Sequence, residues 1–97
     1  MLQGGRLLNG KASSPLGQAR RGFCGRVCSI EVDDRTPGLP AKELESRLIE
    51  LGFIEGAYVE VLHEGPFGHD PIAVRINNAT IALRRREAMA VLVSRLD

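Results

Sequence analysis

The hydrophobic positions of this chain repeat every two residues in several short stretches and at helical spacing in one. The first alternation runs over 26–32, where Cys28, Ile30 and Val32 share one face and Val27 lies on the other. A period of two is typical of a β-strand that has one side on a core. We therefore expect a strand here, ended by the polar residues that follow it.

One amphipathic helix is expected near residues 40–51. Pro40 suits the first helical turn, and Gly52 stands where a left-handed C-terminal cap is wanted. Leucines recur at helical spacing between them, at Leu44, Leu48 and Leu51. This stripe of leucines should pack on the sheet.

Further strands are expected after the helix. The alternating apolar positions are Val59 and Val61, with His63 as the next candidate, then Ile72, Val74 and Ile76, then Ile81 and Leu83. Asn77 and Asn78 tolerate the positive φ of a tight hairpin. Residues 84–88 predict one short helical turn, and Met89–Val93 a last strand. About five short strands predict a mainly β fold, a small closed barrel with one principal helix, because closure removes exposed sheet edges.

The start of the chain differs in composition from the rest. It is rich in Gly and Ser and shows no sustained period, so we expect a disordered basic arm over residues 1–24 and one domain over 25–97. Residues 1–26 carry five basic side chains and no acidic one, whereas the remainder carries 8 basic and 12 acidic residues. A solvated tail is favoured over a contact with nucleic acid or membrane. The acidic body also lacks an aromatic platform for nucleic-acid bases.

Two patterns bear on location. No stretch approaches the roughly 18 apolar residues of a membrane span, and residues 1–23 lack the apolar core of a secretory signal. We expect no direct membrane insertion and a cytoplasmic protein.

The two cysteines, Cys24 and Cys28, are four positions apart. On a strand this spacing corresponds to about 13 Å, too far for a disulfide unless the chain bends. A zinc site would need further ligands, and the usual second Cys pair is missing. The favoured interpretation is a buried Cys28 and a Cys24 at the strand entrance.

Three segments, in order, resemble the motifs of a known family. Residues 48–61 contain a helix ending in Glu-Leu-Gly, an apolar residue, a turn closed by Gly56 and a Val-x-Val strand. Residues 65–72 are similar to a Pro-x-Gly-Asp-Pro loop, and 82–88 to a closing Leu-Arg…Glu-Ala element. Together they resemble the ferrous iron transport protein A (FeoA) family over roughly residues 25–96. Glu55, where the family often has Pro, and the inserted His69 depart from it.

The resemblance implies an SH3-like barrel that is not an enzyme. It implies an accessory of ferrous iron uptake that docks on the cytoplasmic part of the FeoB membrane transporter. The alternative is a regulatory domain related to the SH3-like C-terminal domain of iron-dependent repressors, which ranks second because no helix-turn-helix precedes it here. The candidate docking side chains are Phe53, Ile54, Pro66 and Phe67. One of the first two should pack on the helix cap, and Phe67, in a stiff loop, is the preferred anchor.

The sequence offers no convincing catalytic group. His63, His69 and Asp70 are a candidate metal set, but a pair of loop histidines is usually solvated or hydrogen-bonded, so we expect neither metal nor cofactor. The arginines at 84–86 raise two alternatives. In the first alternative, one of these arginines stabilises GTP hydrolysis in the partner's G domain. In the second, Arg84 packs or forms an ion pair within the barrel while its neighbours are solvated. The second alternative is favoured.

Overall fold

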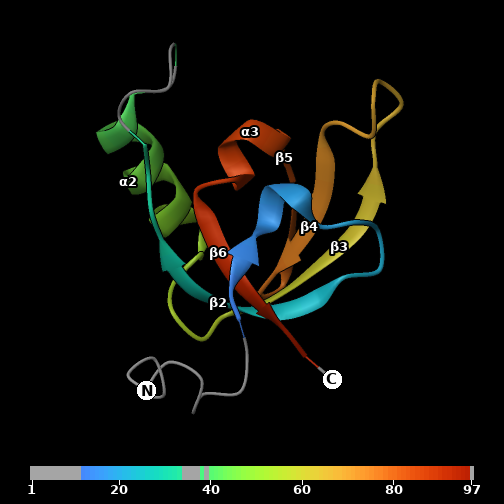
Figure 1. The fold of residues 1–97 in the computed structure, drawn as a ribbon, viewed down its shortest axis with the longest axis horizontal. Coiled ribbons are helices and arrows are strands. Elements are labelled where there is room, and N and C mark those ends of the chain that lie inside the picture. Colours follow the sequence, from blue (N-terminus) through green and yellow to red (C-terminus); the bar gives the residue numbers. More distant parts are fainter. Residues whose placement is uncertain (1–11, 34–37, 39, 97) are drawn as a thin grey trace.

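The computed structural model describes residues 12–33, 38 and 40–96. In this part of the chain six antiparallel strands form one strongly curled sheet in the order β1-β6-β2-β3-β4-β5 (Figure 1). The strands are β1 Ser14–Pro15, β2 Cys24–Ile30, β3 Tyr58–Glu64, β4 Ile72–Ile76, β5 Ala79–Leu83 and β6 Val91–Arg95. The helical elements are the 3-10 turn η1 Leu16–Gln18, the helix α2 Ala41–Leu51 and the short helix α3 Arg85–Ala88. The predicted mainly β barrel with one principal helix is confirmed, with one more strand than expected.

The core lies inside the curl of the sheet, and every described residue that is buried in it is apolar. The inward positions predicted for β4, Ile72, Val74 and Ile76, are all fully buried. Helix α2 adds Leu44 and Leu48 to this core and places Leu51 at its margin, as its leucine spacing predicted. The β4–β5 hairpin turns tightly at Asn77, which has a φ of 57°. None of the described helices is long and apolar enough to cross a membrane.

A β-bulge in β2 overturns the predicted faces of Val27 and Cys28. Its pairing with β6 shifts between Val27 and Ser29, so one extra residue interrupts the alternation. Val27 is consequently buried, whereas Cys28, the predicted core residue, is only partly covered. Beyond the bulge, Ile30 and Val32 do pack against the core as expected.

A second bulge in β3 acts in the same way. The pairing of β3 with β4 shifts between Val61 and His63. Val59 and Val61 are buried as predicted, but His63 is exposed and does not continue their face. The bulge matters for the site described below, because it precedes the half-buried Glu64 at the end of the strand.

The predicted boundary between arm and domain at residue 24 is wrong for residues 12–24. This segment forms β1, which pairs with β6, and η1, and it places Leu16 and Phe23 in the core. Gly17 lies so close to α3 that an added Cβ would collide with the backbone oxygen of Arg85. A two-residue strand and one turn have no measurable period, so their burial could not be predicted from alternation. Residues 1–11 of the predicted arm lie outside the described residues.

Candidate docking site

The loop between β3 and β4, residues 65–71, carries a highly exposed aromatic side chain. We call it the docking loop. Its base is closed by a hydrogen bond from the Gly65 N–H to the Pro71 carbonyl (2.8 Å), and a Cβ on Gly65 would collide with the backbone of Asp70. Phe67 is 84% exposed and the adjacent Pro66 is exposed too. The loop projects from the barrel at the upper right of Figure 1.

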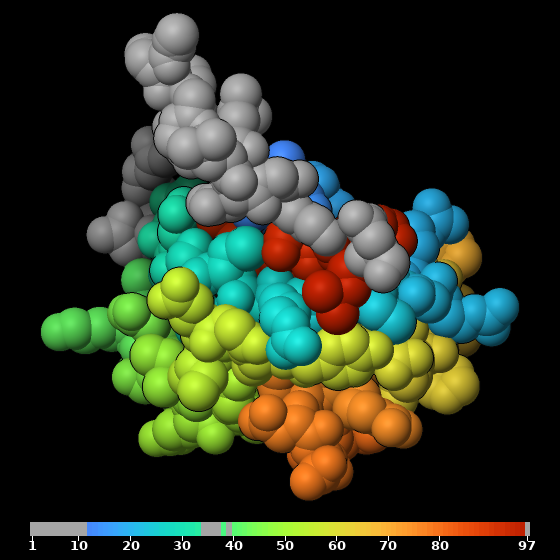
Figure 2. All heavy atoms as spheres, turned by 90° about the horizontal axis from the view of Figure 1, so that it is seen from below, coloured from blue at the N-terminus to red at the C-terminus, as the bar shows by residue number. Residues whose placement is uncertain are grey.

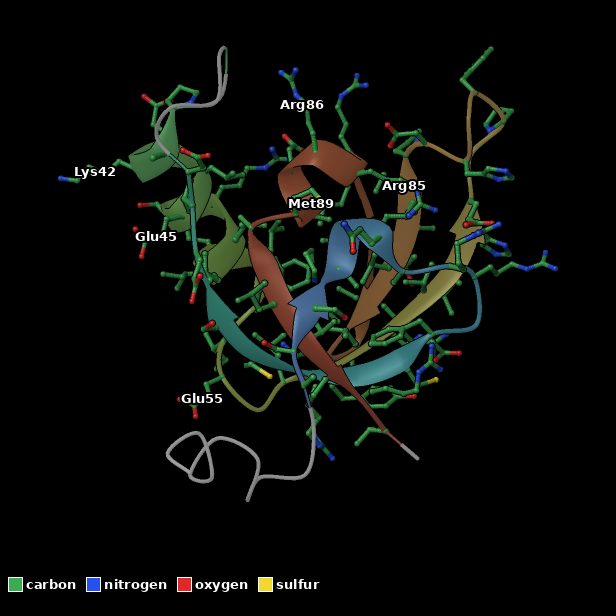
Figure 3. All side chains as sticks on the ribbon, in the orientation of Figure 1. Lys42, Glu45, Glu55, Arg85, Arg86 and Met89 are labelled. Atoms are coloured by element: carbon green, nitrogen blue, oxygen red, sulfur yellow. The ribbon has the colours of Figure 1, made fainter. Side chains whose placement is uncertain are left out.

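Arg85 fastens the base of this loop to the rest of the barrel. Its Nε donates to the His69 carbonyl (2.8 Å), and its Nη1 donates to the carbonyls of Gly17 (3.1 Å) and Ala19 (2.6 Å). Its Nη2 donates to Glu64 Oε2 (2.7 Å). The side chain is only 18% exposed and extends from α3 toward the strands that carry the loop (Figure 3).

The backbone of the same residue supplies a further contact. The Arg85 N–H donates to Asp70 Oδ1 (2.9 Å), which anchors the last turn of the docking loop on α3. One guanidinium and one backbone N–H therefore join α3, the η1 segment, the end of β3 and the docking loop. Because each segment is bound at a carbonyl or carboxylate, the base of the loop is held in place.

Glu64 is the anionic centre of this cluster. Arg85 lies at 2.7 Å from it, Arg20 at 3.3 Å and His69 Nδ1 at 3.6 Å. Partial burial alone would raise the pKa of the Glu64 carboxyl, but the attraction of His69, Arg20 and Arg85, with a hydrogen bond from the Arg21 backbone, outweighs it and lowers that pKa. The carboxylate is therefore ionised at neutral pH.

The prediction that Arg84 would be the structural member of the arginine triplet is wrong by one position. Arg84 and Arg86 are exposed, whereas Arg85 makes the contacts just described. Arg84 precedes α3, and its backbone N–H is bound by the Glu87 carboxylate (3.1 Å). Helix α3 begins one residue later, at Arg85, and it is the Arg85 side chain that points into the barrel. A triplet of identical residues contains no signal for this choice.

The cap at the end of α2 determines which of Phe53 and Ile54 is exposed and could contact a partner. Gly52 adopts φ 109°, its N–H donates to the Ile49 carbonyl (3.0 Å), and the Phe53 N–H donates to the Leu48 carbonyl (3.0 Å). This is the Schellman cap, in which the residue after the glycine packs on the helix. Phe53 is fully buried and Ile54 is 56% exposed, so Phe53 leaves the docking set.

The remaining candidates do not form one surface. Ile54 precedes β3 and Phe67 follows it, and the seven residues of that strand, which span about 20 Å, lie between them. Figure 1 shows the corresponding turn at the lower left and the docking loop at the upper right. Pro66 and Phe67 therefore define one candidate surface and Ile54 belongs to another.

The candidate metal set is not brought together. His63 is exposed on β3, His69 pairs with Glu64, and Asp70 accepts from the Arg85 backbone. No group of three His, Cys, Asp or Glu side chains is close enough to hold a metal ion within the described residues.

Cys24 and Cys28 are both free thiols. A hydrogen bond with Cys24, together with partial burial, raises the pKa of Tyr58.

The curled six-stranded sheet, with its single packed helix, defines a small SH3-like barrel. The family model of the FeoA domain matches residues 14–95. The chain belongs to the FeoA family, whose association is with ferrous iron transport. The family match begins at β1, in agreement with the corrected domain start.

Solved structures support this assignment. FeoA from Stenotrophomonas maltophilia, a prokaryotic SH3 domain protein complexed with zinc, is 29% identical, with a TM-score of 0.66 over 81% of this chain and 87% of that one. FeoA from Chlorobium tepidum is 30% identical, with a TM-score of 0.69 over 86% and 70%. A manganese-dependent transcriptional repressor shares the fold, at 24% identity and a TM-score of 0.68, over 89% of this chain and 43% of that one. No curated protein sequence matches the chain significantly.

Proposed function

We propose that this protein is a cytoplasmic, non-enzymatic accessory of ferrous iron uptake that docks on the cytoplasmic part of a FeoB-type transporter through its docking loop. The observation that carries the proposal is Phe67, an aromatic side chain 84% exposed on a loop fixed at its base. Family membership supports the iron-transport role. The description of the Stenotrophomonas maltophilia protein, which names a ferrous iron transport activating factor as its possible role, agrees with it.

An exposed aromatic ring on a loop that is fixed at its base suits an interface anchor. Burying a Phe side chain removes a large apolar area from water, and a loop that is already ordered loses little conformational entropy on binding. Anchors of this kind contribute about 2 kcal/mol or more to the affinity. Pro66 before the ring limits the freedom of the loop further.

A second candidate function concerns the exposed arginines. Because the guanidinium of Arg85 is bound within the barrel, a catalytic arginine offered to a GTPase partner would have to be Arg84 or Arg86, both of which are exposed. If the protein acts by docking alone, Arg84 and Arg86 change the rate of GTP hydrolysis by the partner only as far as they change the amount of complex formed. Arg84→Ala and Arg86→Ala should then leave stimulated hydrolysis at saturating protein unchanged.

The test of docking is a titration of the full chain with the purified cytoplasmic part of the transporter. Phe67→Ala should weaken binding at least tenfold without changing the unfolding temperature, because the ring has few contacts within the barrel. Ile54→Ala is the matched control, since it removes an exposed apolar side chain at the other end of β3. Equal affinities for Phe67→Ala and the unmodified protein would refute the assignment of the loop.

A further inference from the structure

A second apolar surface lies at the C-terminal end of α2. Ile49 is 48% exposed and lies about 100° around the helix from the buried Leu48. Ile54 is 56% exposed just beyond the cap. In Figure 2 the surface of α2 and the turn after it, green to yellow-green, is continuous. We call Ile49, Ile54 and the glutamates around them the α2 face.

Three carboxylates surround these isoleucines. Glu45 precedes Ile49 by one helical turn, Glu50 follows Ile49, and Glu55 follows Ile54. All three are exposed and none has an ion pair with a described residue. Glu45 and Glu55 point outward on the same side of the molecule (Figure 3).

The cations near the α2 face lie at its margins. Lys42 is at the start of the helix and Arg47 pairs with Glu87 on α3 at 2.9 Å. Arg26, on β2, donates to the Gly56 carbonyl (3.0 Å) beyond Glu55. None of the three forms an ion pair with a glutamate of the face.

The direction of the helix adds to the negative charge. The C-terminal end of an α-helix carries a partial negative charge, which Lys or Arg in the last turn normally offsets. The last turn of α2 contains no basic residue and instead contains Glu50. This arrangement is locally unfavourable, and Glu50 has no ion pair with a described residue that would offset it. Local sequence choices that conflict with stability are common at binding sites.

We propose that the α2 face docks a cationic amphipathic segment of a second protein, with apolar side chains on Ile49 and Ile54 and Lys or Arg beside the glutamates. Charge complementarity selects this occupant. The carboxylates and the helix terminus repel nucleic acid and anionic membranes, whereas the isoleucines disfavour a purely polar partner. Because the docking loop is at the other end of β3, the two surfaces do not overlap. If the docking-loop proposal also holds, one molecule has room for both segments at once.

The test uses the full chain, labelled with ¹⁵N, and a short synthetic peptide of the repeat Leu-Lys-Lys-Leu. Shift changes should be confined to the α2 face, and salt should weaken the affinity. Ile49→Ser with Ile54→Ser should weaken binding at least tenfold, as should Glu50→Lys with Glu55→Lys. Phe67→Ser, the matched control, should leave it unchanged. This control also separates the inference from the docking-loop proposal, because either surface can fail alone.

Two further results distinguish binding from a structural role. Glu50→Lys should raise the unfolding temperature while weakening peptide binding, since a lysine suits the helix terminus. A peptide with Glu in place of Lys should not bind. The inference is overturned if that peptide binds as well, if the shifts map to another surface, or if the isoleucine substitutions leave the affinity unchanged.

Discussion

Replacement of Arg85 by alanine should be the most damaging substitution of an ionisable residue in the described barrel. It removes four side-chain hydrogen bonds, to the carbonyls of Gly17, Ala19 and His69 and to the Glu64 carboxylate. At about 0.5–1 kcal/mol each, the low end of the usual range because the site is partly open to water, the loss is about 2–4 kcal/mol. For a domain of this size that corresponds to a fall of roughly 10–25 °C in the unfolding temperature.

The assay is urea denaturation of the full chain, followed by circular dichroism, with two matched controls. Arg84→Ala and Arg86→Ala remove the same charge from exposed neighbours and should change the free energy of unfolding by no more than about 0.5 kcal/mol. Arg85→Lys keeps the charge but loses the forked donor geometry, so it should fall between the two. If Arg85→Ala proves as stable as Arg84→Ala, the four hydrogen bonds of the Arg85 side chain contribute nothing to stability, which would refute the prediction.

Three other predictions concern the helix cap and the anionic centre. Gly52→Ala should destabilise the protein by about 1–3 kcal/mol in denaturant titrations, because φ is 109° there and the new Cβ would lie 2.6 Å from Asn77 Nδ2. Phe53→Ala should cost about 3–5 kcal/mol and Ile54→Ala less than about 0.5 kcal/mol; equal losses would contradict the assigned cap. The pKa of Glu64 is lowered on folding, so the stability that its carboxylate contributes is present above the unfolded pKa of about 4.3 and is lost as the pH falls through the folded pKa. Glu64→Gln should therefore flatten the acid side of the stability profile measured by thermal unfolding.

Periodicity predicted the regular parts of the fold well. Helices and strands repeat with fixed periods, so the spacing of apolar residues along the chain predicts which side chains face inward. The leucine spacing of α2, the inward positions of β4 and the cap at Gly52 were predictable in this way. The bulges in β2 and β3 do not follow in this way. They depend on how two strands twist past each other, so the faces of Val27, Cys28 and His63 could not be read from alternation alone.

The candidate site was predicted only in part. The exposure of Phe67 could be predicted because Pro66 and glycines around an aromatic residue indicate a stiff, exposed loop, whereas its role in docking stays a prediction. The choice between Phe53 and Ile54 required the hydrogen bonds of the cap, and the role of Arg85 required four segments to be in place at once. Contacts between positions 17 and 85 are tertiary, and no local pattern in a single sequence specifies them.

Site-specific photo-cross-linking tests the docking proposal most directly. A photoreactive phenylalanine analogue is placed at position 67 of the full chain, or at position 54 as control, and irradiated with the cytoplasmic part of the FeoB-type transporter. The account predicts a specific cross-link from position 67 that excess unmodified protein suppresses, and none from position 54. A cross-link from position 54 alone, or none from position 67 under conditions in which the two proteins bind, would contradict it.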